Sequence, residues 1–242
     1  MTERIDRLDL SYILTFESAF HCGSGLPRLL IDRAVRRDAE GYLFVPGATV
    51  KGALRDRCEQ MARLFGLEVR SPHDENAALG EYTTRDSLSR LFGSRLYPGQ
   101  LFIDDLEMQD ADRNFLGRSF SLQTSERTQV SLSRQTGTAK PKMLFSSELG
   151  LTDLRFEGEI YGYVSDVPIN DQPDSPTFAE LLLVSGLMSI DRLGGNKSTG
   201  VGRCQIEVVS LNINGHLCDP AGCLERLVDL EYADIAREEA QA

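Results

Sequence analysis

The chain has 242 residues, of which 41% are hydrophobic and 26% are charged, and its formal net charge is −11. This length suffices for one large domain with a buried core, and the ordinary composition excludes fibrous and low-complexity classes. The longest apolar run, residues 179–190, is far shorter than a membrane span, and the first ten residues contain no apolar signal region. Five cysteines without a CxxC pair argue against a disulfide framework. We therefore expect a cytoplasmic protein without membrane contact.

The first part of the chain predicts a strand, a helix and an inserted segment. Residues 8–16 carry apolar side chains at every second position, which predicts a half-buried strand. Thr49 is expected to cap a helix, because a hydroxyl at that position accepts a bond from the first free N–H groups. The apolar stripe of this helix comprises Val50, Ala53, Leu54, Cys58, Met61, Leu64 and Phe65. Residues 66–98 are polar and broken by glycine and proline, so we expect an inserted lid there.

The second part of the chain completes a β-α-β-β-α-β order. A strand over 101–108 is followed by a polar stretch, 109–150, that is long for a connection within a compact domain and is typical of functional segments. The remaining predicted elements are a strand over 154–164, a buried helix over 177–191 capped by Ser175, a strand over 203–213 and an amphipathic helix over 224–236. This order predicts an α+β, ferredoxin-like fold with large insertions.

Two tyrosines lie on the polar face of the third predicted strand. Tyr161 and Tyr163 alternate with the apolar residues of that strand. In an RNA-recognition fold such aromatic side chains stack on bases, but we expect the inserted segments to cover them here.

The negative net charge is unevenly distributed. Residues 28–57 hold seven basic and four acidic side chains, and residues 121–142 hold four basic and one acidic, so each segment has a net charge of +3. The last 24 residues carry −5. Because phosphate binding depends on the local field, an acidic protein with two basic segments remains able to bind nucleic acid.

A glycine-rich loop, GGNKSTGVGR at residues 194–203, suggests phosphate binding. It is not a nucleotide-binding P-loop, since Asn196 precedes Lys197 where the motif needs glycine, and a helix precedes the loop instead of following it. One helix cap does not require Gly194, Gly195, Lys197 and Ser198 together with two further glycines. Successive backbone N–H groups form anion-binding nests, and an extended oligonucleotide backbone fits such a loop better than a nucleotide does.

The start of the first helix, VPGATVKGALR at residues 45–55, offers a second phosphate site. Free N–H groups and the helix dipole would attract a phosphate, with Thr49, Lys51 and Arg55 beside it. The alternative is an ordinary capped helix with a solvated basic face.

Several blocks in fixed order resemble one family. They include IDRAVRRDAEGYLFVPGATVKGALR at 31–55, VSLSRQTGTAKPKMLFSSE at 130–148 and the late glycine-rich loop, and together they span most of the chain. The set resembles the backbone subunits of type III CRISPR–Cas effector complexes, in the RAMP superfamily. The resemblance implies a modified ferredoxin-like (RRM-type) palm with a lid at about 66–98 and a β-hairpin thumb at about 109–150.

The resemblance also implies partners and site residues. Copies or paralogues of the chain would stack along a guide (CRISPR) RNA together with other subunits of the complex, and each thumb would displace a base pair between guide and target RNA. Sequence would be read by base pairing while the protein holds the RNA backbone. The matching positions are Asp32 for cleavage and, for RNA contact, Gly47, Lys51, Arg55, Gly194, Gly195, Lys197, Ser198 and thumb residues such as Val130, Leu132 and Arg134.

The expected chemistry is endoribonucleolytic cleavage of the target RNA. A phosphodiester is cut by its own 2′-hydroxyl when that group is held in line with the leaving oxygen. Asp32 would hold a Mg²⁺ ion or act as a weak base, and Arg33, Arg36 or Arg37 would offset the developing charge. Asp32 could instead cap a turn or pair with Arg36.

Three alternatives stay open. His21 is a rival general base, as in guide-processing relatives that use a histidine near the N-terminus. The chain could be a purely structural guide-RNA-binding subunit, or a stand-alone endoribonuclease that processes the guide. A metabolic enzyme is disfavoured by the failed P-loop spacing.

Overall fold

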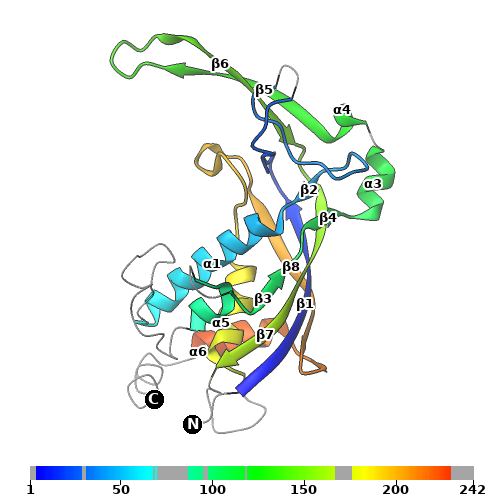
Figure 1. Cartoon of the computed structure of the whole chain (residues 1–242), viewed down its shortest axis with the longest axis vertical. Helices are drawn as coiled ribbons and strands as arrows, with labels where there is room; N and C mark the ends of the chain where they lie inside the picture. Colours follow the sequence, from blue (N-terminus) through cyan, green and yellow to red (C-terminus); the bar gives the residue numbers. More distant parts are fainter. Residues whose placement is uncertain are drawn as a thin grey trace.

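The computed structural model of the chain describes residues 4–28, 31–67, 69, 87–94, 98–117, 119–166 and 176–229. Its centre is an antiparallel sheet in which β1 (Arg4–Phe16) pairs with β7 (Arg155–Asp166) on one side and β8 (Cys204–Ile213) on the other. Figure 1 shows these strands as a long curved layer, with α1, α5 and α6 gathered on one side of it.

The sheet has the strand order β2-β4-β7-β1-β8-β9, and β3 also pairs with β7. The short strands are β2 (Phe44–Val45), β3 (Leu101–Ile103), β4 (Leu106–Met108) and β9 (His216–Leu217). Between β1 and the β3–β4 segment runs α1 (Gly47–Leu64), and between β7 and β8 runs α5 (Phe178–Met188). The predicted β-α-β-β-α-β order and the α+β ferredoxin-like class are confirmed.

The core lies between the sheet and its helices. Every second residue of β1 from Leu8 to Phe16 is buried, as the alternation predicts. The helices α1 and α5 pack closely because Gly186 has no side chain, and a Cβ there would lie 2.6 Å from Cys58 Sγ. Each fully buried leucine, such as Leu54, contributes about 2 kcal/mol by leaving water. This packing fixes the position of α1, whose first turns form one wall of a groove.

The helix α5 is apolar on nearly all sides and is buried from Ala179 to Leu187, as predicted. It begins at Phe178, with Thr177 as its cap: the Thr177 hydroxyl accepts from the Glu180 N–H, and the Glu180 carboxyl accepts from the Thr177 N–H. The expected cap, Ser175, lies outside the described residues. Because a capping box satisfies two N–H groups at once, Thr177 fixes the helix start two residues after that position.

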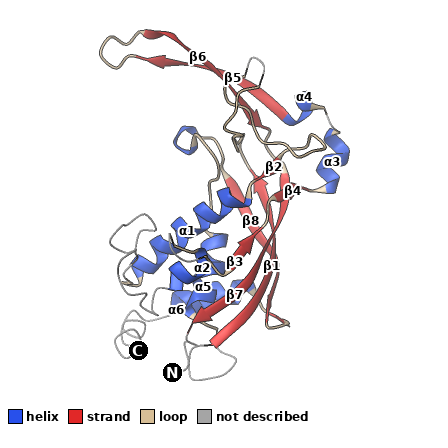
Figure 2. Cartoon of the chain, in the orientation of Figure 1, coloured by secondary structure: helices blue, strands red, loops and turns tan. Residues whose placement is uncertain are grey.

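A two-stranded hairpin forms the predicted thumb. Its strands are β5 (Thr124–Leu132) and β6 (Ala139–Gly150), paired in a separate sheet. Figure 2 shows the two strands projecting well beyond the palm. Two short helices, α3 (Asp110–Leu116) and α4 (Phe120–Gln123), lead into it from β4.

Several predicted boundaries were wrong. Thr49 does not cap α1, because Pro46 is the cap position and the Gly47 N–H donates instead to Asp105 Oδ1 at 2.7 Å. Leu64, expected on the apolar stripe, is 81% exposed in the last turn. The single strand expected over 101–108 is divided into β3 and β4, and the two residues between them include this capping aspartate.

Two peripheral helices complete the described part of the chain. The predicted lid lies largely outside the described residues, but α2 (Ser87–Phe92) within it buries Leu88, Leu91 and Phe92 in the palm core. The last described helix is α6 (Pro220–Asp229), and the predicted continuation to residue 236 lies outside the described residues. None of the described helices has the length and apolar character that a membrane crossing requires.

Candidate RNA-binding groove and cleavage loop

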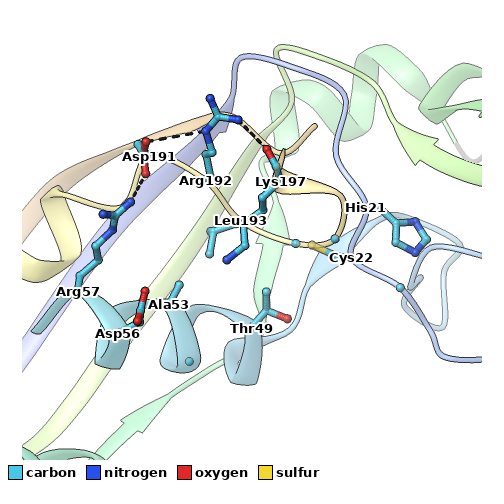
Figure 3. A pocket seen from close by; sticks show the side chains of 14 residues that line it. His21, Cys22, Thr49, Ala53, Asp56, Arg57, Asp191, Arg192, Leu193 and Lys197 are labelled. Atoms are coloured by element: carbon cyan, nitrogen blue, oxygen red, sulfur yellow. Dashed lines mark hydrogen bonds and ion pairs between the residues drawn. The ribbon is translucent and has the colours of Figure 1, made fainter. Parts of the chain in front are cut away.

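A groove of about 630 Å³ separates the start of α1 from the glycine-rich loop. Figure 3 shows Thr49 and Ala53 on its helical wall, with Leu193 and Lys197 opposite. The groove thus brings together two segments nominated from sequence that are about 145 residues apart in the chain. Its other lining residues are His21, Cys22, Gly23, Gly52, Asp56, Arg57, Asp191, Arg192, Gly194 and Gly195.

Among the described residues that line the groove, Lys197 is the cation that is not held by a carboxylate. Arg57 and Arg192 both pair with Asp191, and Arg192 also donates to the Lys197 carbonyl at 2.7 Å. The Lys197 side chain is exposed, and its ammonium group has no ion-pair partner among the described residues. An exposed ammonium at the mouth of a groove is well placed to contact a phosphate.

The glycines of the loop allow its backbone to pack closely against the segment that follows β1. The Gly195 N–H donates to the His21 carbonyl at 2.8 Å, and the Gly202 N–H donates to the Ala19 carbonyl at 2.8 Å. Gly194 and Gly202 have φ of +87° and +80°, and a Cβ at Gly202 would collide with the Leu193 carbonyl. The N–H groups of Gly195 and Gly202 are therefore bonded inside the protein, and the predicted anion nest is wrong for both of them.

The short helical turn Lys197–Thr199 is the part of the loop that faces outward. Asn196 and Gly200, both in the left-handed region, bracket it. Lys197 and Ser198 are both exposed on this turn. The packed glycines therefore present these two side chains beside the groove.

The start of α1 is not a bare anion site. Besides its bond to Asp105, Gly47 is packed so closely that a Cβ would collide with the Ile103 carbonyl. Arg55 donates to Glu59 at 2.8 Å and to the Gly93 carbonyl at 2.7 Å, and Lys51 does not line the groove. Of the residues nominated on this helix, only Thr49 lies in the groove.

Asp32 lies in an irregular loop held against the base of the thumb. Its N–H donates to the Ser146 carbonyl at 3.1 Å, and its Oδ2 accepts from the Ser146 N–H at 2.7 Å. The side chain is exposed. Arg36, its proposed ion-pair partner, donates instead to the Gly23 carbonyl at 3.3 Å, while Arg33 stacks 4.9 Å from the Phe145 ring centroid. In the described part of the chain, the carboxylate is thus oriented by Ser146 of β6 and not by a neighbouring arginine.

His21 contacts the same thumb strand and also lines the groove. Its Nδ1 lies 2.8 Å from the Glu148 carbonyl oxygen. Since a carbonyl only accepts, this contact places the proton on Nδ1 and leaves Nε2 as the basic nitrogen of the neutral ring. The two candidates for proton transfer, Asp32 and His21, are therefore both anchored on β6, at residues 146 and 148.

Sequence reasoning missed the buried polar residues behind this loop. Glu148 is almost fully buried and binds Arg37, Arg28 and Thr124. Burial by itself would raise the pKa of Glu148, but hydrogen bonds from Arg37, Val35 and Thr124 outweigh it and hold the pKa below its ordinary value. The local sequence around it, SSELG at 146–150, gives no signal of this role.

The donors for a metal ion are few. No cluster of three or more His, Cys, Asp or Glu side chains suited to a metal exists among the described residues. Asp32 offers a single carboxylate, with one oxygen already bonded to Ser146. Mg²⁺ is often held by one or two carboxylates together with substrate phosphates and water, so Asp32 fits as a ligand shared with RNA and not as part of a closed protein site.

The thumb carries an exposed apolar strip. Val130 and Leu132 on β5 are 45% and 59% exposed, and Arg134 follows in the exposed turn. Met143 and Leu144 on β6 are also exposed, and Leu144 is the cross-strand partner of Val130. Both lie inside the thumb predicted at about 109–150 but were not among the residues nominated for RNA contact.

The outer face of the sheet is open and acidic. Tyr161 and Tyr163 are 38% and 54% exposed, so the expectation that inserted segments cover them was wrong. Phe102 stacks on Tyr161 with ring centroids 5.5 Å apart, and the Tyr161 hydroxyl donates to Asp104. The negative charge of Asp104 raises the pKa of Tyr161. The neighbouring exposed acids on β7 are Glu157 and Glu159, whereas Asp9 on β1 is paired with Arg7. This charge disfavours RNA on the face that an RNA-recognition fold ordinarily uses.

Comparison with known proteins places these features in context. The sequence model of the RAMP superfamily matches residues 13–205. A chain of the cryo-EM structure of the type III-B Cmr-beta bound to cognate target RNA superposes with a TM-score of 0.55 at 11% identity, covering 83% of this chain and 97% of that one. The search of curated proteins gives no match.

Proposed function

Because the chain belongs to the RAMP superfamily, we propose that it is a guide-RNA-binding backbone subunit of a type III CRISPR–Cas effector complex that cleaves guide-complementary target RNA. The observation that carries the proposal is the attachment of Asp32 to Ser146 at the base of a projecting hairpin. A carboxylate in this position would lie beside the RNA that a thumb would splay. The similar fold of a chain from an RNA-bound type III-B complex supports it.

The guide backbone would run along the groove between α1 and the glycine-rich loop. Lys197 and Ser198 supply charge and a hydroxyl at its mouth, and Thr49 supplies a hydroxyl on the opposite wall. Such contacts hold phosphates irrespective of sequence, which suits a protein that leaves recognition to base pairing. The exposed strip on the thumb, including Val130 and Leu132, would enter the guide–target duplex and displace a base pair.

Cleavage would depend mainly on geometry. A displaced nucleotide can place its 2′-hydroxyl in line with the leaving oxygen, and alignment of that kind supplies much of the rate. Asp32 would help remove the proton from the hydroxyl, and Arg33 and Arg36 would offset negative charge on the phosphate. A bound Mg²⁺ would supply Lewis-acid stabilisation of that charge, with Asp32 as its protein ligand.

A structural subunit without cleavage activity is the alternative function. Such a subunit would have the same groove, thumb and superfamily, but its Asp32 would not take part in cleavage. A stand-alone guide-processing endoribonuclease is the other, and His21 would then be essential, with its free Nε2 facing substrate.

The test is cleavage of a guide-complementary RNA by the reconstituted complex. We compare wild type with Asp32→Asn and Asp32→Ala, each with Mg²⁺ and with EDTA. Asp32→Asn is the matched variant, because its amide oxygen can still accept the Ser146 N–H while the negative charge is lost. We expect regularly spaced cuts that both substitutions and EDTA abolish, with the complex still assembled. Cuts that persist in Asp32→Asn would refute the catalytic role and favour the structural subunit.

A further inference from the structure

The loop that carries Asp32 has little regular structure of its own. The described residues between 20 and 43 form isolated bridges, some within the loop, such as Gly23 with Val35, and others to β6, such as Arg33 with Ser147. Its position relative to the thumb therefore depends on its contacts with that segment. The base of the thumb provides them, and most converge on a single residue.

Glu148 binds this loop through both its side chain and its backbone. Its Oε2 accepts from the Val35 N–H at 3.1 Å, and its Oε1 accepts from Arg37 at 2.8 Å and Arg28 at 3.4 Å. Its own N–H donates to the Arg33 carbonyl at 2.9 Å. These contacts flank Asp32 on both sides along the chain.

The same carboxylate also ties the two thumb strands to each other and to His21. Thr124, the first residue of β5, donates from Oγ1 to Glu148 Oε1 at 3.0 Å. The backbone carbonyl of Glu148 is the partner of His21 Nδ1. Glu148 therefore contacts the loop that carries Asp32, the side chain of His21 and the facing thumb strand β5.

Buried charge makes this arrangement sensitive to the loss of either partner. The side chain of Glu148 is 1% exposed and that of Arg37 is 8% exposed, so each compensates the other's buried charge. Removal of one partner leaves a buried, uncompensated ion, and the structure around it must rearrange. Since Glu148 is enclosed by its partners and does not face the groove, it is not itself an acid or base for the substrate.

We propose that Glu148 is a positioning residue that couples the base of the thumb to Asp32, so that cleavage depends on where the thumb strands lie. This rests on the proposed cleavage function. A thumb correctly seated in the guide–target duplex would hold β6, and β6 would hold the Asp32 carboxylate through Ser146 and Glu148. A displaced thumb would take the carboxylate out of line with the scissile phosphate.

The experiment compares Glu148→Gln with wild type in the reconstituted complex. Glutamine keeps the size of the side chain but loses the charge, and its amide group cannot satisfy Val35 and both arginines together. We expect the single-turnover cleavage rate to fall at least tenfold while the affinity for target RNA changes less than twofold. Glu207→Gln on β8, an exposed glutamate, is the matched control and should cleave at the wild-type rate.

Hydrogen exchange gives a readout that does not depend on cleavage. In Glu148→Gln we expect faster exchange in peptides covering residues 31–37 and 143–150, and unchanged exchange in β1 and β8. If the substituted chain does not assemble, Thr124→Val removes one hydrogen bond from the same carboxylate and should produce the same changes at smaller amplitude.

The outcomes separate the two proposals. A wild-type cleavage rate and wild-type exchange in Glu148→Gln would overturn the positioning role, even if Asp32→Asn abolishes cleavage. Equal loss of RNA affinity and rate would also overturn it, since a folding or binding defect would then suffice. If Asp32→Asn cleaves normally, the proposed function fails, and the positioning proposal fails with it.

Discussion

A buried pair of acids, at the end of the palm distant from the thumb, should make the free energy of unfolding depend on pH. Glu180 of α5 and Asp6 of β1 are both almost fully buried. Asn214 donates to Asp6 at 2.7 Å, and Arg4 lies 2.6 Å from Asp6 and 3.8 Å from Glu180. Burial, with the negative charge of Asp6 adding to it, raises the pKa of Glu180 from 4.5 to about 7. Glu180 is thus protonated in the folded protein under conditions where it is ionised in the unfolded chain.

The size and sign of the effect follow from proton linkage. A rise in pKa from 4.5 to about 7 corresponds to about 3 kcal/mol, at about 1.4 kcal/mol for each pH unit. Between these pH values the folded state binds more protons than the unfolded state. The free energy of unfolding therefore falls as pH rises. The stabilisation from a neutral Glu180 is complete below pH 4.5 and is lost as pH rises through about 7.

The perturbation is Glu180→Gln, which imitates the protonated carboxyl at every pH. Urea unfolding of the isolated subunit at pH 5 and pH 8 gives the free energy of unfolding for both proteins. We expect the variant to gain up to about 3 kcal/mol relative to wild type between those pH values. Titrating groups that do not interact with Glu180 cancel in the comparison, and Glu207→Gln provides an exposed control. A difference between wild type and Glu180→Gln that is constant from pH 5 to pH 8 would refute the reasoning.

Two further predictions concern the glycine-rich loop. Gly202→Ala places a Cβ against the Leu193 carbonyl at a φ of +80°, so we expect a loss of at least about 1 kcal/mol of stability in urea unfolding; unchanged stability would mean that the close approach is not required. Lys197→Ala removes an exposed ammonium, so stability should change by less than about 0.5 kcal/mol. Guide-RNA affinity should fall for all sequences alike, and the slope of log affinity against log salt should decrease by about 1. An unaltered salt slope would exclude a phosphate contact at Lys197.

The local patterns of the sequence predict most of the palm. A half-buried strand is what the alternation from Leu8 to Phe16 predicts. A buried helix is what the apolar run from Ala179 to Leu187 predicts. The unusual length of residues 109–150 indicated a functional segment, and the family resemblance implied that it is a thumb. The order of these elements then identified the ferredoxin-like class.

The parts that could not be predicted depend on contacts between distant residues. The start of α1 is set by Asp105, which lies 58 residues away, and no local rule connects the two. Glu148 and Arg37 are 111 residues apart, and each resembles an ordinary surface charge when read alone. The glycines of the late loop were nominated for phosphate binding, but they show a structural role. That role, close packing against the segment after β1, appears only when Ala19 and His21 are in place.

The acidic outer face of the sheet gives a meaning to the net charge of −11. Glu157 and Glu159 lie on the side of the sheet away from the helices, whereas the exposed Lys197 lies beside α1 on the helical side. A subunit charged in this way has a dipole moment, and the field of an RNA strand would exert a torque on it. The strand would repel the sheet face more strongly than the face with Lys197, so the subunit would rotate before contact. The charge that makes the protein acidic would thus orient its approach, and the rate of productive encounter would fall as salt screens that torque.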